Sequence, residues 1–253
     1  MADLFVESFF LFQQHLRRRA LPDWVTKVPS ILAVERRPLP LRSPATFITG
    51  ENGMGKSTLI EAIAVACGFS IEGGPYGLRG GPSPRDTTRG ESPFQGVASV
   101  TRGPRAMEGY YLRAESHINV PGNFLKAPEL RSLLEGKSHG ESVMSAIDRY
   151  FHPRGLYILD EPEAGLSAVR QMALLGQLHA LVQRGAQIIV STHSPILLSY
   201  PGAAVWEIIE AGLVRTTLRE TTAFRALRDF YEDPHGVADY MMRVAAQDPE
   251  ALG

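Results

Sequence analysis

The sequence predicts an α/β fold built around a mostly parallel β-sheet. Three short apolar segments support this prediction, because each has the length and composition of a buried strand: 45–49, 155–159 and 186–190. Helical patterns follow the first two segments, at 58–68 and 168–184. Strands that alternate with helices of this length usually lie side by side in a parallel sheet.

Composition limits the class of protein. With 253 residues, 44% of them hydrophobic, the chain is long enough for one large α/β domain. No apolar run approaches the roughly 18 residues that a membrane span needs. Asp3 and Glu7 stand where a signal peptide would be basic. The single cysteine, Cys67, excludes a disulfide within the chain, so we expect a cytoplasmic protein without a membrane span.

The stretch Gly50–Ser57 fills the pattern G-x-x-x-x-G-K-[ST] and stands between a predicted strand and a predicted helix. In that context the backbone N–H groups of such a loop surround phosphate oxygens, and the helix N-terminus adds partial positive charge. Lys56 would reach the β- and γ-phosphates of a nucleotide, and Ser57 would bind Mg²⁺. An ordinary glycine-rich turn is the alternative. The predicted nucleotide-binding residues are Gly50, Glu51, Asn52, Gly53, Met54, Gly55, Lys56, Ser57 and Thr58.

The N-terminal half contains less regular patterns. Residues 4–14 fit a strand or the start of a helix, and their aromatic residues favour a strand. Pro22 and Pro29 are expected to interrupt regular structure, and Pro38 and Pro40 bracket a short extended piece. Residues 72–93 are rich in glycine and proline, which predicts a flexible lid or a disordered loop.

From residue 96 onward, the sequence predicts helices and strands with clearer boundaries. Two strands are predicted at 96–102 and 109–116, followed by a helix at 124–135. A polar turn at 136–141 then leads into a helix that ends at Tyr150. The C-terminal part is expected to form an edge hairpin over 205–219, turned at Ala211–Gly212, and then helices.

Two carboxylates and a histidine stand at the ends of predicted core strands. Asp160 would hold Mg²⁺ across from Ser57, and Glu161 would polarise the attacking water as a general base. His193 would contact the γ-phosphate and position that water. Ligands gather at the carboxyl ends of strands in open α/β sheets, so these side chains should meet. A helix cap and a structural histidine are the alternatives.

These segments resemble the ABC-type ATPases. The matching residues are the loop 50–58, Ser138–Glu141, Leu156–Pro162, Ala164–Ser167 and Ser191–Pro195, with the histidine 33 residues after Asp160. In particular, the pattern looks like the small stand-alone predicted AAA/ABC-type ATPases related to RecF and SMC proteins. The resemblance implies a P-loop NTPase sandwich in one domain, 1–253. It also implies an antiparallel β subdomain and a small helical lobe over about 117–150.

The resemblance further assigns residues that contact ATP. The family signature corresponds to Ser138, His139, Gly140 and Glu141, which lie 22 residues before Asp160 when counted from Ser138. His139 replaces a glycine of the family pattern. Glu115 occupies the place of the Q-loop glutamine, and Gln95 is the alternative.

The resemblance implies a Mg²⁺-dependent ATPase that cycles between a monomer and a head-to-tail homodimer with ATP between the subunits. The setting would be DNA repair, DNA maintenance or antiphage defence, with a protein partner or DNA. One alternative is the energising subunit of an ABC transporter, which should carry a Q-loop glutamine and an adenine-stacking aromatic residue. Another is an ATP sensor without turnover, against which the intact Lys56, Asp160, Glu161 and His193 argue.

Overall fold

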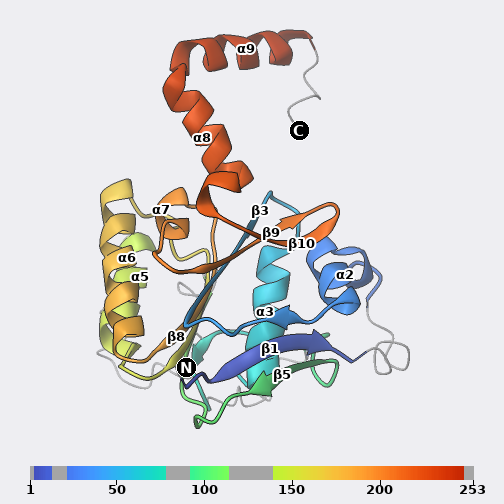
Figure 1. Cartoon of the computed structure of the whole chain (residues 1–253), viewed down its shortest axis with the longest axis vertical. Coiled ribbons are helices and arrows are strands. Elements are labelled where there is room, and N and C mark those ends of the chain that lie inside the picture. The colour runs from blue at the N-terminus through green and yellow to red at the C-terminus, as the bar shows by residue number, and fades with distance from the viewer. Residues whose placement is uncertain (1–2, 13–21, 78–91, 114–138, 248–253) are drawn as a thin grey trace, which may run out of the picture.

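The computed structural model describes residues 3–12, 22–77, 92–113 and 139–247 (Figure 1). Its centre is a sheet of seven strands in the order β10-β9-β3-β8-β7-β6-β4. The five central strands are parallel, and β10 and β4 are antiparallel edges. In chain order the strands are β3 (Ala45–Gly50), β4 (Gly74–Pro75), β6 (Gly109–Arg113), β7 (Leu156–Asp160), β8 (Gln187–Ser191), β9 (Ala204–Ile209) and β10 (Gly212–Thr216). The predicted α/β class with a mostly parallel sheet is therefore confirmed.

The central strands are apolar because both faces of the sheet are covered. Alternate residues point to opposite faces, so in β3 Ile48 packs in one core and Phe47 in the other. The Ile48 side holds α3 (Lys56–Cys67) and α2 (Pro29–Arg36). The Phe47 side holds α5 (His139–Tyr150), α6 (Ala168–Gln183) and the short α7 (Pro195–Leu198).

A separate antiparallel sheet packs on α3, in the order β2-β1-β5. Its strands are β1 (Val6–Leu11), β2 (Leu39–Pro40) and β5 (Ala98–Arg102). This sheet agrees with the expected antiparallel β subdomain and with the preference for a strand within 4–14. The two predicted strands at 96–102 and 109–116 exist, but they belong to different sheets, since β5 pairs with β1 and β6 pairs with β7.

A buried glutamine joins the two sheets. Gln187 begins β8 and is 1% exposed. Its Oε1 accepts hydrogen bonds from the N–H groups of Phe5 and Val6, at 2.9 and 3.0 Å. Its Nε2 donates to the carbonyls of Val6 and Leu41, at 2.8 and 2.9 Å. All the hydrogen-bonding capacity of this amide is used, as a buried polar group requires.

Three expectations need correction. Pro29 does not break regular structure, because it is the first residue of α2, a position where its missing N–H costs nothing. Residues 74–75, which were expected to lack regular structure, pair with Tyr110 and Tyr111 as β4. The turn predicted for 136–141 is too long, since α5 already begins at His139. The remainder of the predicted lid, 78–91, and the helix predicted at 124–135 lie outside the described residues.

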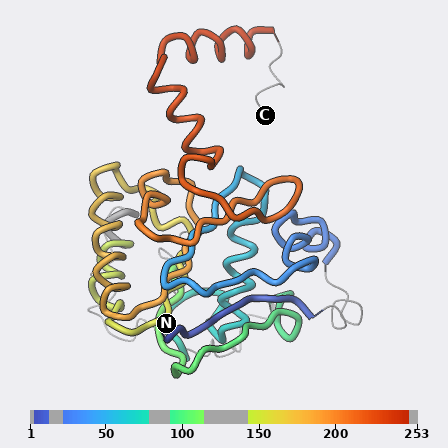
Figure 2. The backbone as a smooth tube through the Cα atoms, in the orientation of Figure 1, coloured from blue at the N-terminus to red at the C-terminus, as the bar shows by residue number. Residues whose placement is uncertain are grey.

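The C-terminal residues form the hairpin β9–β10, the short helix η2 (Leu218–Glu220) and two further helices, as predicted. These helices are α8 (Thr222–Glu232) and α9 (Pro234–Gln247). They extend away from the body of the protein, and α9 turns away from α8 (Figures 1 and 2). Within the described part of the chain, no helix has the length and apolar character needed to cross a membrane.

Candidate functional site

The predicted phosphate loop connects β3 to α3, as the sequence indicated. Gly50, Gly53 and Gly55 all have positive φ, at 145°, 78° and 84°, which L-residues with side chains rarely adopt. A Cβ on Gly55 would also lie 2.0 Å from Cγ1 of Val28. The Nζ of Lys56 donates hydrogen bonds to the carbonyls of Gly50 and Glu51, at 3.0 and 3.1 Å. The ammonium group therefore lies within the curve of the loop.

Residues before β3 support the loop from outside. The hydroxyl of Ser30, near the start of α2, donates to the carbonyl of Gly55 at 2.7 Å, and its N–H donates to the carbonyl of Met54 at 3.2 Å. Ser30 is fully buried. Sequence reasoning missed this contact, because a serine in a short helix carries no signal that it faces a loop 25 residues later.

Asp160 lies at the end of β7, and parallel pairing sets it beside Ser191 of β8 and Arg113 of β6. The hydroxyl of Ser191 donates to Oδ1 of Asp160 at 2.5 Å, and the side chain of Ser57 also bonds to this carboxylate. Burial raises the pKa of Asp160 to about 6, while the hydrogen bonds from Ser191 and Ser57 oppose that rise. Asp160 and Ser57 therefore meet, as predicted.

Asp160 and Ser57 are suited to Mg²⁺, which prefers hard oxygen ligands. This ion usually binds through one or two carboxylates plus phosphate and water, rather than a cage of protein side chains. Among the described residues, no group of three or more His, Cys, Asp or Glu side chains could hold a metal ion. The donor set fits a Mg²⁺ ion delivered with a nucleotide.

Glu161 and His193 face one another. Glu161 has a positive φ of 46°, and its N–H donates to both the carbonyl and the hydroxyl of Ser191, each at 3.1 Å. Its Oε1 is 3.5 Å from Nε2 of His193. The pKa of Glu161 lies below its ordinary value, because the side chain of His193 lies beside the carboxylate, although burial opposes the shift. A carboxylate that is ionised at neutral pH and only half-buried can accept a proton from water.

Lys56 belongs to the same cluster. Burial lowers its pKa, and the negative charges of Glu161 and Asp160 oppose that effect. The carboxyl ends of β3, β7 and β8 thus bring the loop, the two carboxylates and the histidine to one edge of the sheet. This is the edge at which open α/β sheets bind their ligands.

Glu163 is a site residue that the sequence analysis missed. Its Oε1 accepts hydrogen bonds from the hydroxyl of Thr192, at 2.6 Å, and from the N–H of His193, at 2.7 Å. Oε2 is buried and has no hydrogen-bond partner among the described residues. Burial raises the pKa of Glu163, while the bond from Thr192 opposes the rise. The carboxylate therefore fixes the backbone that carries His193.

A second contact joins the same two segments. The hydroxyl of Ser194, which caps α7, donates to Oε1 of Gln171 at 2.6 Å. The amide of Gln171 donates in turn to the carbonyl of Leu166 at 2.9 Å. The residues after β7 and those after β8 are thus bonded together at two places.

The predicted signature and Q-loop residues are only partly described. Ser138 and Glu115 lie outside the described residues, and His139, Gly140 and Glu141 form the first turn of α5. Gln95, the alternative to Glu115, is exposed in the turn before β5 of the antiparallel sheet. Gln95 therefore does not lie at the carboxyl end of a core strand.

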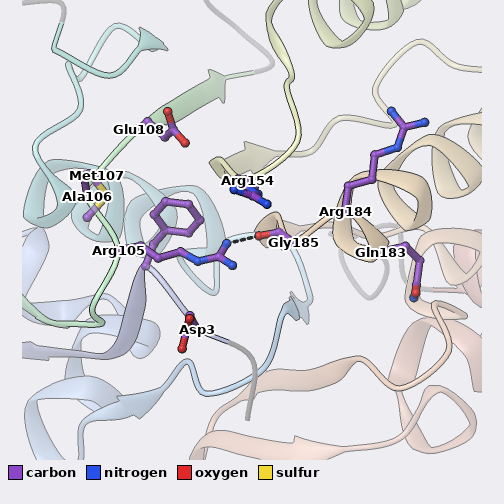
Figure 3. A pocket seen from close by; sticks show the side chains of 10 residues that line it. Asp3, Arg105, Ala106, Met107, Glu108, Arg154, Gln183, Arg184 and Gly185 are labelled. Carbon is purple, nitrogen blue, oxygen red and sulfur yellow. Dashed lines mark hydrogen bonds between the residues drawn. The ribbon is translucent and has the colours of Figure 1, made fainter.

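A cavity of about 680 Å³ lies at the opposite end of the sheet (Figure 3). Glu108 and Arg154, which line it, stand just before β6 and β7, so the cavity is near the amino ends of these strands. The guanidinium of Arg105 donates to the carbonyl of Gly185 and lies 5.2 Å from the ring centroid of Phe5. None of the predicted site residues within the described ranges lines this cavity.

Two family models match separate parts of the sequence. Residues 129–199, which include Asp160, Glu161 and His193, match the family described as "AAA domain, putative AbiEii toxin, Type IV TA system". Residues 31–119, which include the phosphate loop, match a second family described as "AAA domain". Neither match covers half of the chain.

Among curated proteins, the chain is 27% identical over 188 residues to the cytochrome c biogenesis ATP-binding export protein CcmA of Rhizobium meliloti (strain 1021). The alignment covers 65% of this chain and 84% of that relative.

Solved structures that match the chain include "An inward-facing conformation of a putative metal-chelate type ABC transporter", with 15% identity, a TM-score of 0.44 and 88% coverage of both chains. Another is an ATP-binding cassette of an ABC transporter in its ADP conformation, with 13% identity and a TM-score of 0.38. It matches over 81% of this chain and 90% of that one.

The sequence matches agree with the residues that the fold brings together. One of the two AAA family models covers the phosphate loop, and the other covers the strand ends that face this loop. The curated relative, whose name describes an ATP-binding protein, aligns over most of its length. These matches and the loop geometry support a P-loop ATPase of the ABC/AAA type.

Proposed function

We propose that the protein is a Mg²⁺-dependent ATPase whose ATP-bound form is a head-to-tail homodimer. The observation that carries this proposal is the convergence of Lys56, Asp160, Glu161 and His193 at the carboxyl ends of the core strands, with Glu161 3.5 Å from His193. A phosphate loop alone would account for nucleotide binding. The ionised carboxylate beside a histidine adds a group able to activate water.

Each side chain has a defined task. The loop N–H groups and Lys56 bind the phosphates, and Ser57 and Asp160 hold the Mg²⁺. When bound, this ion offsets the negative charge that develops on the phosphate oxygens. Glu161 takes a proton from the attacking water, and His193 orients that water. Glu163 holds the backbone of His193 in place through its contact with the N–H group.

Exposed apolar side chains next to the site support the homodimer. Val169 and Met172 lie in the first turns of α6, directly after the segment that carries Glu161 and Glu163, and are 75% and 58% exposed. A second subunit that approaches this edge would cover them. Its signature residues, Ser138–Glu141, would then complete the phosphate site through the N-terminus of α5.

The proposal is tested by Glu161→Gln, which keeps the size of the side chain but cannot take the proton of water. ATP hydrolysis should fall by roughly 10²–10⁴-fold while ATP affinity is retained. At a protein concentration low enough for the nucleotide-free protein to be monomeric, the variant should accumulate as an ATP-bound dimer, measured by light scattering after gel filtration, and adding Ser138→Arg should abolish that ATP-dependent dimer. Glu210→Gln, on an exposed turn, is the matched control. A Glu161→Gln protein that hydrolyses ATP at the normal rate would contradict the assigned role.

In the cell, the ATP cycle would act on a protein partner or on DNA, in DNA repair, DNA maintenance or antiphage defence. The match to an AAA domain described with a toxin–antitoxin system favours a defence role. The relative described as an export protein favours the second candidate, the energising subunit of a transporter. Isolating the ATP-trapped Glu161→Gln protein from its native cells distinguishes them, since only the second candidate should copurify with an integral membrane protein.

A further inference from the structure

We propose that α8 and α9 form a dimerisation arm through which two copies of this chain associate without nucleotide. The arm is residues 222–247. The first residue of the arm is fixed to the central sheet, because the N–H of Thr222 donates a hydrogen bond to the buried carboxylate of Glu207 in β9 at 2.8 Å. The hydroxyl of Thr221, which is fully buried, caps α8 by accepting a hydrogen bond from the N–H of Phe224.

Beyond this root the arm makes little contact with the body. No residue of α8 or α9 is buried, although the structure describes both helices over their full length. Figures 1 and 2 show the two helices projecting from the end of the molecule. Helices of 11 and 14 residues are marginal in water when nothing packs against them. An arm of this kind needs a partner surface.

Each helix carries an apolar face. In α8, Leu227, Phe230 and Tyr231 share one side, at a spacing of three and four residues, while the charged residues lie around the rest of the helix. In α9, Tyr240 and Met241 share a side with the half-buried Val237 and Val244. Half of the exposed large hydrophobic side chains within the described ranges belong to the arm: Leu227, Phe230, Tyr231, Tyr240, Met241 and Met242.

The elbow between the helices keeps these faces apart. Oδ1 of Asp233 accepts a hydrogen bond from the N–H of Gly236 at 2.9 Å, which caps α9. A Cβ on Gly236 would lie 2.0 Å from Oδ2 of the same carboxylate, which would have to move to accommodate a side chain. Because α9 turns away at this elbow, neither helix covers the apolar face of the other.

The apolar area and the charge of the arm favour a second copy of this chain as its binding partner. With roughly 200 Å² for a large side chain, the five residues on these faces, Leu227, Phe230, Tyr231, Tyr240 and Met241, are exposed by 40–73% and offer on the order of 500 Å² per copy. Two arms would then bury on the order of 1,000 Å², about the smallest area expected of a specific interface.

The arm also carries little net charge, so two copies repel one another only weakly. Three arginines and four carboxylates of the arm nearly balance, and Asp239 and Arg243 lie on the side of α9 away from Met241. A twofold pair of identical faces is the commonest geometry of homodimers. The arms therefore hold two copies together whether or not ATP is present.

The test measures the mass of the full chain without nucleotide, by light scattering after gel filtration at about 100 μM. We expect twice 27.7 kDa. Tyr231→Glu combined with Met241→Glu should give the monomer mass, because both side chains are exposed in the single chain and carboxylates cannot be buried in an apolar interface. Arg225→Gln combined with Asp239→Asn alters the other sides of the same helices without changing the net charge of the arm, and should leave the dimer intact.

A second measurement needs no variant. Hydrogen exchange of the amides in 222–247 should slow at least tenfold between about 1 and 100 μM protein, and the amides of α3 should not change. A monomer at 100 μM, a dimer that survives both glutamate substitutions, or concentration-independent exchange in the arm would each refute the proposal. Because no nucleotide is used, such a failure would not bear on the ATPase proposal.

Discussion

At the scale of single residues, the carboxylate of Glu163 joins the residues after β7 to those after β8, because it accepts hydrogen bonds from Thr192 and His193. Glu163→Ala removes both bonds, so the backbone that carries His193 loses its support. We expect the kcat for ATP hydrolysis to fall by roughly 10–100-fold with little change in KM, because the loss concerns alignment rather than nucleotide binding.

Two further variants separate positioning from general damage. Glu163→Gln keeps an oxygen that can accept from Thr192 and His193, so it should recover most of the lost rate. Glu210→Ala, on an exposed turn, should behave like the unmodified protein. A steady-state assay in which Glu163→Ala raises KM and leaves kcat unchanged would show that this residue serves binding instead.

Lys56 supplies the main positive charge of the phosphate loop. Lys56→Ala should weaken nucleotide binding by about 2–4 kcal/mol, the value of a desolvated charge-assisted contact. Titration with a fluorescent ATP analogue measures this, with Lys27→Ala, an exposed lysine in the 3₁₀ helix η1 (Val25–Lys27), as the control. Equal affinity in the two variants would mean that Gly50–Ser57 is only a turn.

At the scale of elements, α2 is a support for the phosphate loop. Ser30→Ala removes the hydrogen bond to the carbonyl of Gly55, which should cost about 1 kcal/mol and lower Tm by a few degrees. ATP affinity should fall several-fold as well, because the loop loses an external contact. Calorimetry and nucleotide titration check the two effects, and Ser199→Ala, at an exposed position, is the control. Normal affinity despite a lower Tm would limit α2 to a stabilising role.

The core elements were predictable because burial on both faces leaves a continuous apolar strand, as in 45–49 and 155–159. Their polar ends were predictable too, since Asp160 and Glu161 follow such a strand directly. The helix α2 was missed because a proline at a helix start has the same appearance in sequence as a proline that ends one. Likewise, Glu163 was missed because its partners lie about 30 residues away, and only strand pairing brings them together.

At the scale of the whole molecule, α3 lies between the two sheets, and Cys67 near its end is fully buried. Burial raises the pKa of this thiol to about 12, so almost no thiolate exists at pH 8. A disulfide reagent should therefore leave the native protein unmodified over hours and react with one thiol in urea.

This labelling would report global unfolding, because Cys67 is the single cysteine of the chain. The urea midpoint of labelling should coincide with the midpoint from circular dichroism, which also serves as the independent control. Complete reaction within minutes in native buffer would show instead that the layer around α3 opens locally, without unfolding of the parallel sheet.

The side-chain amide of Gln187 restrains the motion of one sheet relative to the other. Its four hydrogen bonds tie β1 and the residue after β2 to the first residue of β8, and all four are shielded from water. Sliding one sheet over the other would break them together, at about 1 kcal/mol or more for each bond left unpaired. We therefore expect the two sheets and α3 to behave as one rigid body. If the proposed ATP cycle displaces the phosphate loop, that displacement should pass to the segments attached to this body rather than be taken up between the sheets.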